Sequence, residues 1–145
     1  TDVTGFATTT AVHLMETEDM VCAGIRFANG AIGTIDATTA AFPGFHEEIM
    51  ITGENGTLAL RGGELLAQFH DGRVERVEND IASGGTGADP MAFPHDYHRA
   101  VMADFADAIR ERRAPKVTGE DALRVHRLID ALIETGRSGA PARVR

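Results

Sequence analysis

The sequence predicts an α+β fold, in which an open, mostly antiparallel sheet of about six to seven strands carries two C-terminal helices on one face. In the first half of the 145-residue chain, short apolar runs alternate with tight-turn dipeptides: Asn29-Gly30, Asn55-Gly56, Gly62-Gly63 and Asp71-Gly72. In the second half, apolar residues recur every three or four positions over two segments, as they do in amphipathic helices. Strands followed by helices favour an antiparallel sheet over a parallel one.

The strands are expected at residues 3–13, 19–28, 31–41, 46–53, 57–61, 64–69 and 73–78, with a short edge strand at 141–144. In the second of these, Val21, Ala23, Ile25 and Phe27 alternate with their neighbours and predict one apolar face. The third is rich in threonine and alanine, which favours close approach of another layer. Because the helices cover one face, the other face needs an oligomer partner or an adjoining domain.

The first helix is expected from His95 to Arg112, after a loop at residues 81–94 that places Pro94 near the first turn. Its expected buried stripe repeats every four residues: Tyr97, Val101, Phe105 and Ile109.

The second helix is expected to begin at Thr118, with Asp121 completing a capping box, and to end at Gly136 and Gly139. Its expected apolar face consists of Ala122, Val125, Leu128, Ile129, Leu132 and Ile133.

Composition predicts one soluble domain and limits its partners. The net charge of −8 argues against nucleic acid or an anionic membrane as a partner. A single cysteine, Cys22, excludes an intramolecular disulfide and favours the cytoplasm, and its strand position predicts a small core residue rather than a nucleophile. The chain starts at Thr1 without an initiator methionine, which suggests a fragment of a longer polypeptide.

Few side chains form a pattern that could carry chemistry. His95 and His98 share one face of a helix start and could supply two metal ligands, although two ligands do not make a site. His46 stands beside Glu47 and Glu48, where a charged strand end is favoured over an acid–base group. The glycines at 84–87 match no phosphate-binding fingerprint, and no catalytic triad can be assembled.

An ordered series of motifs nevertheless resembles a known family. The series runs through Glu18-Asp19 before a strand, Phe27-x-Asn29-Gly30-Ala31-x-Gly33, Ile51-x-Gly53-x-x-Gly56-Thr57-Leu58, Tyr97-x7-Phe105, Val117-Thr118-Gly119-Glu120-Asp121-Ala122 and Gly136-x-x-Gly139. It resembles the C-terminal domain of the glucose–fructose oxidoreductase / inositol dehydrogenase / rhizopine-catabolism (Gfo/Idh/MocA) family, and the likeness spans about residues 3–144. The resemblance implies that residues 1–145 are a single C-terminal domain, without the NAD- or NADP-binding Rossmann domain of full-length members.

The resemblance also implies hydride transfer to or from a sugar, cyclitol or similar polyol, with this domain supplying substrate wall and oligomer interface. The family's catalytic lysine and histidine lie in Glu-Lys-Pro and Asp-x-x-x-His motifs, which this sequence lacks. No catalytic, cofactor-binding or metal residue is therefore expected here, and the isolated chain is expected to be inactive and to bind no cofactor. The substrate-facing candidates implied by the family are Phe45, His46, His95 and His98.

Two other readings of the sequence remain open. The chain could be a stand-alone module that dimerises through its sheet without catalysis. It could also be a small metal-dependent enzyme that uses His95, His98 and a carboxylate. In the preferred reading the partners are a second copy, forming a dimer or tetramer through the open sheet face, the missing Rossmann domain and a small polyol.

Overall fold

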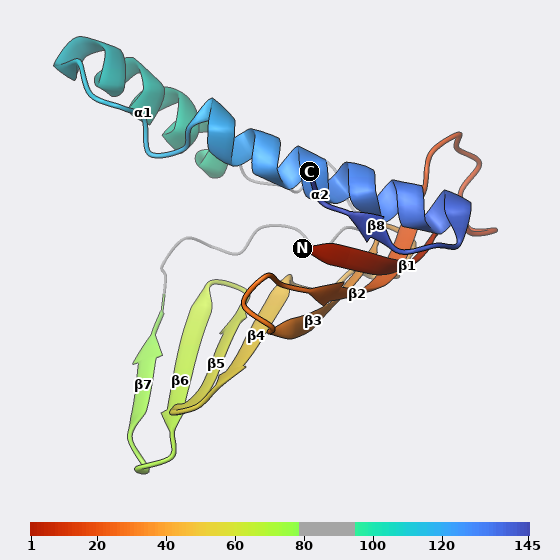
Figure 1. The fold of residues 1–145 in the computed structure, drawn as a ribbon. Helices are drawn as coiled ribbons and strands as arrows, with labels where there is room; N and C mark the ends of the chain where they lie inside the picture. Colours follow the sequence, from red (N-terminus) through yellow and green to blue (C-terminus); the bar gives the residue numbers. More distant parts are fainter. Residues whose placement is uncertain (79–94) are drawn as a thin grey trace. The chain divides into compact units, whose positions relative to one another are not determined.

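The computed structural model describes residues 1–78 and 95–145, and it confirms the α+β class (Figure 1). The described strands form two antiparallel sheets of four strands each, where one sheet of about six to seven strands was expected. The chain divides into two compact units, residues 1–40 with 95–145 and residues 41–94. Each unit has its own sheet, and each is described by itself below.

The first unit is built on a sheet with strand order β3-β2-β1-β8. Its strands are β1 (Asp2–Thr8), β2 (Met20–Arg26), β3 (Ile32–Thr38) and β8 (Ala142–Arg143), and the last confirms the expected edge strand. The Asn29-Gly30 turn between β2 and β3 is confirmed, since Gly30 has a φ of 89° that favours glycine.

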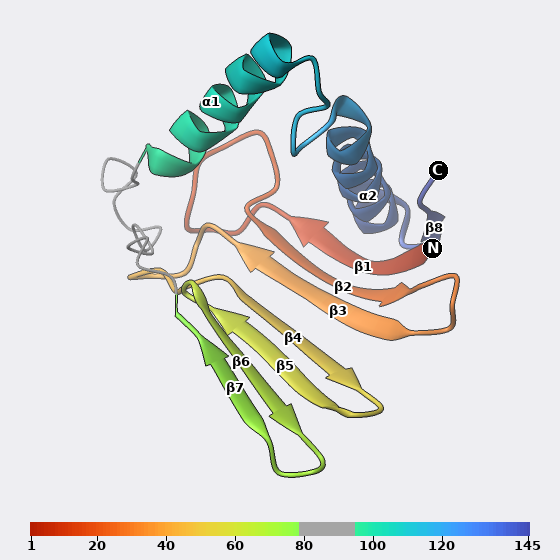
Figure 2. The same ribbon diagram turned by 90° about the vertical axis from the view of Figure 1, so that its left-hand side faces the viewer.

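One face of this first sheet packs against α2 (Gly119–Ser138), which runs along β1 (Figure 2). The buried core between them contains Val3, Ala23, Ile25, Ala131, Leu132 and Ala142. The predicted alternation in β2 is confirmed, because Ala23 and Ile25 are buried and Val21 packs beside them. Cys22 lies on the opposite face of β2 and is half-buried, so it is not the core residue expected from its strand position.

The start of α2 follows its sequence signal. The Thr118 side chain accepts a hydrogen bond from the backbone N–H of Asp121, and the Asp121 carboxylate accepts one from the backbone N–H of Thr118. The predicted capping box is therefore confirmed.

The end of α2 differs in part from the prediction. Gly139 ends the helix in the left-handed region with a φ of 68°, as expected. Gly136 does not end it, because the helix continues to Ser138. A Cβ at Gly136 would lie 2.6 Å from the Cβ of Ala7, so this glycine lets α2 approach β1 closely.

The buried face of α2 is also narrower than predicted, since Val125 and Ile129 are exposed.

The helix α1 (Asp96–Glu111) has an exposed apolar stripe rather than the buried one predicted. The side chains of Tyr97, Val101, Phe105 and Ile109 are all more than half exposed, and Ala108 is its one buried residue. Within the first unit, α1 packs on no strand and not on α2. The apolar periodicity correctly predicts a helix with one apolar face, but that face has no partner among the described residues.

The second unit is a four-stranded meander with strand order β4-β5-β6-β7. Its strands are β4 (Glu48–Gly53), β5 (Gly56–Arg61), β6 (Glu64–Phe69) and β7 (Val74–Val77), joined at the three predicted glycine turns. The register places a set of apolar side chains on one face, which we call the apolar face of the second sheet: Ile49, Ile51, Leu58, Leu60, Leu65, Ala67, Phe69 and Val77. The other face carries charged residues, including the ion pair between Arg76 and Glu64.

Several strands are shorter than predicted, and the differences of two or more residues at one end include the following three. β1 ends at Thr8 instead of residue 13, β3 ends at Thr38 instead of 41, and β4 begins at Glu48 instead of 46. The predicted loop at 81–94 and the predicted position of Pro94 lie outside the described residues.

Candidate functional site

The two helix-start histidines lie close to each other along the chain, at the exposed start of α1. His95 occupies the N-cap position of α1 without a side-chain capping bond, and His98 lies in the first turn. Both are exposed. Within residues 1–78 and 95–145, no group of three or more His, Cys, Asp or Glu side chains is placed to hold a metal ion.

The other two candidates belong to the second unit. Phe45 is 72% exposed, and His46 is exposed with its ring beside the Gly62 turn, where a Cβ would come within 3.2 Å of the imidazole. The structure therefore places the four predicted substrate residues as two pairs, one in each unit. Their role in substrate binding stays a prediction.

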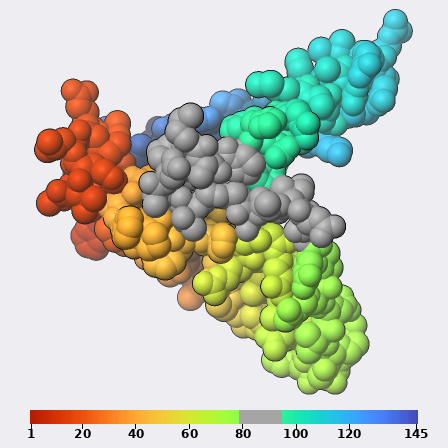
Figure 3. Space-filling model, turned by 180° about the vertical axis from the view of Figure 1, so that it is seen from behind, coloured from red at the N-terminus to blue at the C-terminus, as the bar shows by residue number. Residues whose placement is uncertain are grey.

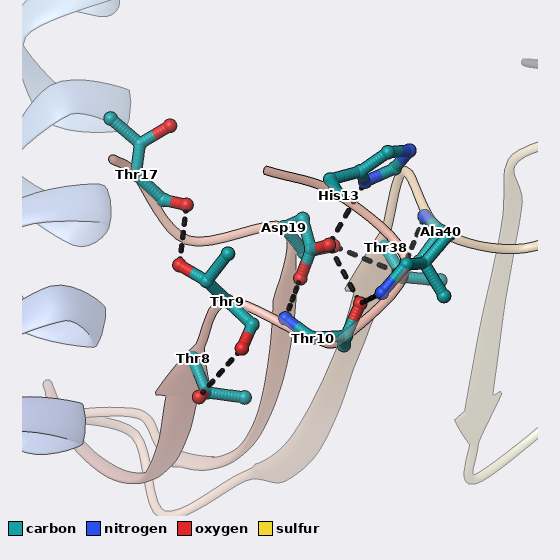
Figure 4. A network of polar contacts seen from close by, with 9 residues as sticks. Thr8, Thr9, Thr10, His13, Thr17, Asp19, Thr38 and Ala40 are labelled. Carbon is teal, nitrogen blue, oxygen red and sulfur yellow. Dashed lines mark hydrogen bonds and ion pairs between the residues drawn. The ribbon is translucent and has the colours of Figure 1, made fainter. Parts of the chain in front are cut away.

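A buried carboxylate that the sequence did not single out organises the end of the first sheet. The side chain of Asp19, at the start of β2, is fully inaccessible to solvent. Its oxygens accept hydrogen bonds from the Thr10 backbone N–H at 2.6 Å, the Thr10 hydroxyl at 2.7 Å and Nδ1 of His13 at 2.9 Å (Figure 4). These contacts draw residues 9–18, here called the β1–β2 loop, back onto the strand that follows it.

The main chain of Asp19 also forms hydrogen bonds, to the end of β1 and to the end of β3. Its N–H donates to the carbonyl of Thr8 at 3.1 Å, and its carbonyl accepts from the hydroxyl of Thr38 at 2.9 Å and from the N–H of Thr39 at 3.0 Å. One residue thus connects the end of β1, the start of β2 and the end of β3. This network is why β1 ends at Thr8 although a strand was predicted to continue to residue 13.

The protonation of the cluster follows from its hydrogen bonds. Burial by itself raises the pKa of the Asp19 carboxyl, but the bonds from Thr10 and His13 outweigh it and hold the pKa below the ordinary value of 3.8. Because the carboxylate is ionised and can only accept, Nδ1 of His13 must carry the proton. The Nε2 atom makes no hydrogen bond to the described residues.

An imidazole oriented by a carboxylate can act as an acid–base group or accept a hydrogen bond from a hydroxyl. Two hollows of the first unit lie elsewhere, one along α2 near Arg137 and one between α1 and the segment after it. The contacts of the His13 cluster are all made within the β1–β2 loop and to Asp19, and they support a structural role. The sequence signal that could have found it is the Glu18-Asp19 pair, which was used only as a family marker.

Comparison with known proteins identifies the family to which the chain belongs. The family model described as "Oxidoreductase family, C-terminal alpha/beta domain" matches residues 3–144. The chain belongs to this Gfo/Idh/MocA oxidoreductase family. The match covers almost the whole sequence, so the resemblance read from the motifs is confirmed. No curated protein sequence matches the chain significantly.

Solved structures share the fold of this family's C-terminal domain. An oxidoreductase domain protein from Kribbella flavida has 19% identity and a TM-score of 0.77, with 99% of this chain and 44% of that chain covered. The WlbA dehydrogenase from Bordetella pertussis, in complex with NADH and UDP-GlcNAcA, has 23% identity, a TM-score of 0.69 and coverage of 99% and 38%. An aldose-aldose oxidoreductase from Caulobacter crescentus, complexed with glycerol, has 18% identity, a TM-score of 0.68 and coverage of 98% and 40%. The chain thus spans less than half the length of these family members.

No helix within residues 1–78 and 95–145 combines the length and the apolar character that crossing a bilayer requires.

Proposed function

We propose that residues 1–145 are the C-terminal, substrate-binding and oligomerisation domain of an NAD(P)-dependent cytoplasmic oxidoreductase that acts on a sugar, cyclitol or similar polyol. The family match over residues 3–144 carries this proposal. The chain covers only 38–44% of the solved relatives named above. Two of these are complexes, one with NADH and UDP-GlcNAcA and the other with glycerol. A separate Rossmann domain would then supply the cofactor site, the catalytic lysine and the catalytic histidine.

The proposed contribution of this chain to catalysis is a substrate wall. Exposed imidazoles at His46, His95 and His98 can donate or accept hydrogen bonds to hydroxyl groups, and the exposed Phe45 ring can pack against the apolar face of a sugar ring. These side chains would bind and orient the polyol. The hydride would pass between substrate and nicotinamide on the other domain.

The proposed oligomer contact is the apolar face of the second sheet. Ile49, Ile51 and Val77 are 56%, 59% and 60% exposed there, with Glu75 on the same face. The opposite face carries the Arg76–Glu64 ion pair together with exposed Met50 and Val74. Four strands about 4.8 Å apart and six residues of about 3.3 Å each give a planar area of about 380 Å². A standard stable interface buries about 800 Å² per partner, so this face alone supports only weak, concentration-dependent self-association.

The alternative is a stand-alone module that dimerises through the same face and catalyses nothing. The exposed apolar face favours it as much as it favours the oxidoreductase domain. The two readings differ in what precedes Thr1 in the encoded protein. The oxidoreductase reading expects an upstream G-x-G-x-x-G dinucleotide motif and a Glu-Lys-Pro segment. If the gene encodes neither, the oxidoreductase proposal fails and the module remains.

The functional experiment uses the full encoded protein and follows NAD(P)H absorbance with a panel of polyols and sugars. His46→Ala and His98→Ala are expected to raise KM for the preferred substrate with a smaller effect on kcat, since they remove binding contacts. His126→Ala is the matched control, because this histidine is also exposed but lies on α2. Equal kinetics for all three variants would remove the substrate wall from the proposal.

A further inference from the structure

One apolar stripe of α2 is buried over the second half of the helix and exposed over the first half. Val125, Leu128 and Leu132 are spaced three and four residues apart and therefore share one side of the helix. Leu132 is 7% exposed, Leu128 is partly buried and Val125 is 57% exposed. All of residues 122–127 are exposed, so the cover that the sheet gives to this side ends near the middle of the helix.

The cover ends there because β1 starts there. α2 runs in the same direction as β1 (Figure 1), and the Thr135 hydroxyl accepts a hydrogen bond from the N–H of Gly5 at 3.3 Å. The stretch from Gly5 back to Thr1 spans about 13 Å of strand, which equals the rise of about nine residues of helix. Thr1 therefore lies about level with His126, and the first two turns of α2 extend past the start of the strand.

An aromatic side chain is exposed on the sheet at the same end. Phe27 directly follows β2, and a Cβ at Gly33 would lie 3.6 Å from its ring. Gly33 pairs with the buried Ile25, and paired residues share a face, so the Phe27 ring lies on the side of the sheet that faces α2. Phe27 is 45% exposed, and the register of β1 and β2 places it level with Thr1.

The opposite end of the same helix and sheet is closed. A Cβ at Gly136 would lie within 3 Å of Ala7, and the guanidinium of Arg137 lies 3.4 Å from the carboxylate of Glu18. The β1–β2 loop, orange-red in Figure 3, leaves the sheet at this closed end. At the end where Thr1 lies, in contrast, the helix and the sheet each expose an apolar side chain.

The position of Thr1 selects the preceding segment of the encoded protein as the molecule that covers these side chains. Such a segment exists if the proposed function holds, because that function places a Rossmann domain before Thr1. The solved relatives named above are more than twice as long as the part that this chain covers. A segment that is covalently joined at this point has a high effective concentration there, which a second copy or another protein lacks.

We propose that the residues immediately before Thr1 pack between the first half of α2 and the end of the β2–β3 hairpin, where they bury Val125 and Phe27. The segment presents apolar side chains to both, since a charged side chain at this place would lose its hydration without a partner. The contact fixes the orientation of the preceding domain on this one by packing instead of leaving it to a flexible linker. It is separate from the sheet contact proposed above and does not depend on it.

The test uses the full encoded protein with the photo-crosslinking amino acid p-benzoylphenylalanine in place of Val125 or Phe27, and identifies the crosslinked peptides by mass spectrometry. Both positions are expected to crosslink within one chain to residues immediately before Thr1. His126 is the matched control position, because it is exposed but lies two residues before Leu128 and thus on the opposite side of the helix. It is expected to give no such crosslink.

Thiol reactivity gives a second readout with a smaller substitution. In a Cys22→Ser background of the full protein, Val125→Cys is expected to react with Ellman's reagent at least tenfold more slowly than His126→Cys, since the preceding segment covers only the former. Equal reaction rates, no crosslink from either position, or crosslinks to a second copy or to another part of residues 1–145 would each overturn the inference.

Oxidation of NAD(P)H by the wild-type protein tests the proposed function separately. An active oxidoreductase with a freely reactive thiol at position 125 would retain the proposed function and lose the packing inference. An inactive protein with a protected thiol at this position would retain the packing inference and lose the proposed function.

Discussion

The close approach of α2 to β1 gives a prediction whose sign can be worked out from the structure. A Cβ at Gly136 would lie 2.6 Å from the Cβ and 2.7 Å from the backbone N of Ala7. Carbon atoms in contact prefer about 3.5–4.0 Å, so Gly136→Ala requires α2 to move about 1 Å away from the strand. That movement would loosen the packing of Leu132 and Ala131 on the sheet.

The expected cost is moderate because two effects oppose each other. Overpacking a well-packed core by one methyl group costs about 1–3 kcal/mol, whereas replacing glycine by alanine within a helix gains up to about 1 kcal/mol. We therefore expect Gly136→Ala to lower the free energy of unfolding by about 1–2 kcal/mol. A domain of this length would lose about 2–8 °C in Tm.

The assay is urea unfolding followed by far-UV circular dichroism, which suits a chain without tryptophan. Gly119→Ala is the matched control in the same helix: nothing lies within 4 Å of its Cβ, so the substitution is expected to be neutral or to stabilise by up to about 1 kcal/mol. Adding Ala7→Gly to Gly136→Ala is expected to recover part of the loss. A Gly136→Ala protein as stable as the wild type would refute the close-packing argument.

Three further predictions concern the helix cap, the buried carboxylate and the cofactor. Thr118→Ala should cost about 1 kcal/mol in chemical denaturation, whereas Thr118→Ser should stay close to the wild type because its hydroxyl still accepts the Asp121 N–H; equal losses would argue against the cap. The pKa of Asp19 is lower in the folded than in the unfolded chain, so its stabilising contribution is complete above about pH 4 and is lost as the pH falls through the folded-state pKa. Unfolding measured from pH 7 to pH 2 should accordingly show an Asp19→Asn deficit that shrinks in acid, and a deficit independent of pH would contradict this. A titration of the isolated chain with NADH should show no saturable fluorescence change, since the sequence has no dinucleotide fingerprint, and saturable binding would contradict the division of roles between domains.

Local signals in the sequence predicted the parts of the fold that are determined locally. The Asn29-Gly30 turn needs a residue with positive φ, and the Thr118–Asp121 capping box closes within one helical turn. The end of β1 depends instead on Asp19, nine residues after Thr10, and no local signal marked it, so the strand was predicted too long. The separation into two sheets has no local signature either, because strand periodicity says which face is apolar but not which strands share a sheet.

The site residues were harder to predict for the same reason. The apolar repeat of α1 identified a surface that needs a partner, but amphipathicity does not say whether that partner lies in the same chain. The four substrate candidates came from family resemblance rather than from their own chemistry, and the described contacts leave them exposed. His13, in contrast, carries the one histidine ion pair of the described residues, yet its sequence neighbours gave no sign of Asp19.

The Glu18-Asp19 pair now has a physical explanation that the motif alone lacked. Asp19 satisfies its buried carboxylate entirely with donors from the β1–β2 loop, and its main chain bonds to β1 and to the end of β3. Glu18 faces the other way and lies 3.4 Å from the guanidinium of Arg137 in the last turn of α2. A buried carboxylate is costly unless every oxygen is bonded, so a change at position 19 would release the loop and the strand ends together. The pair therefore fixes loop, sheet and helix in one arrangement, and any substrate or partner that contacts this end of the domain meets a surface already in place.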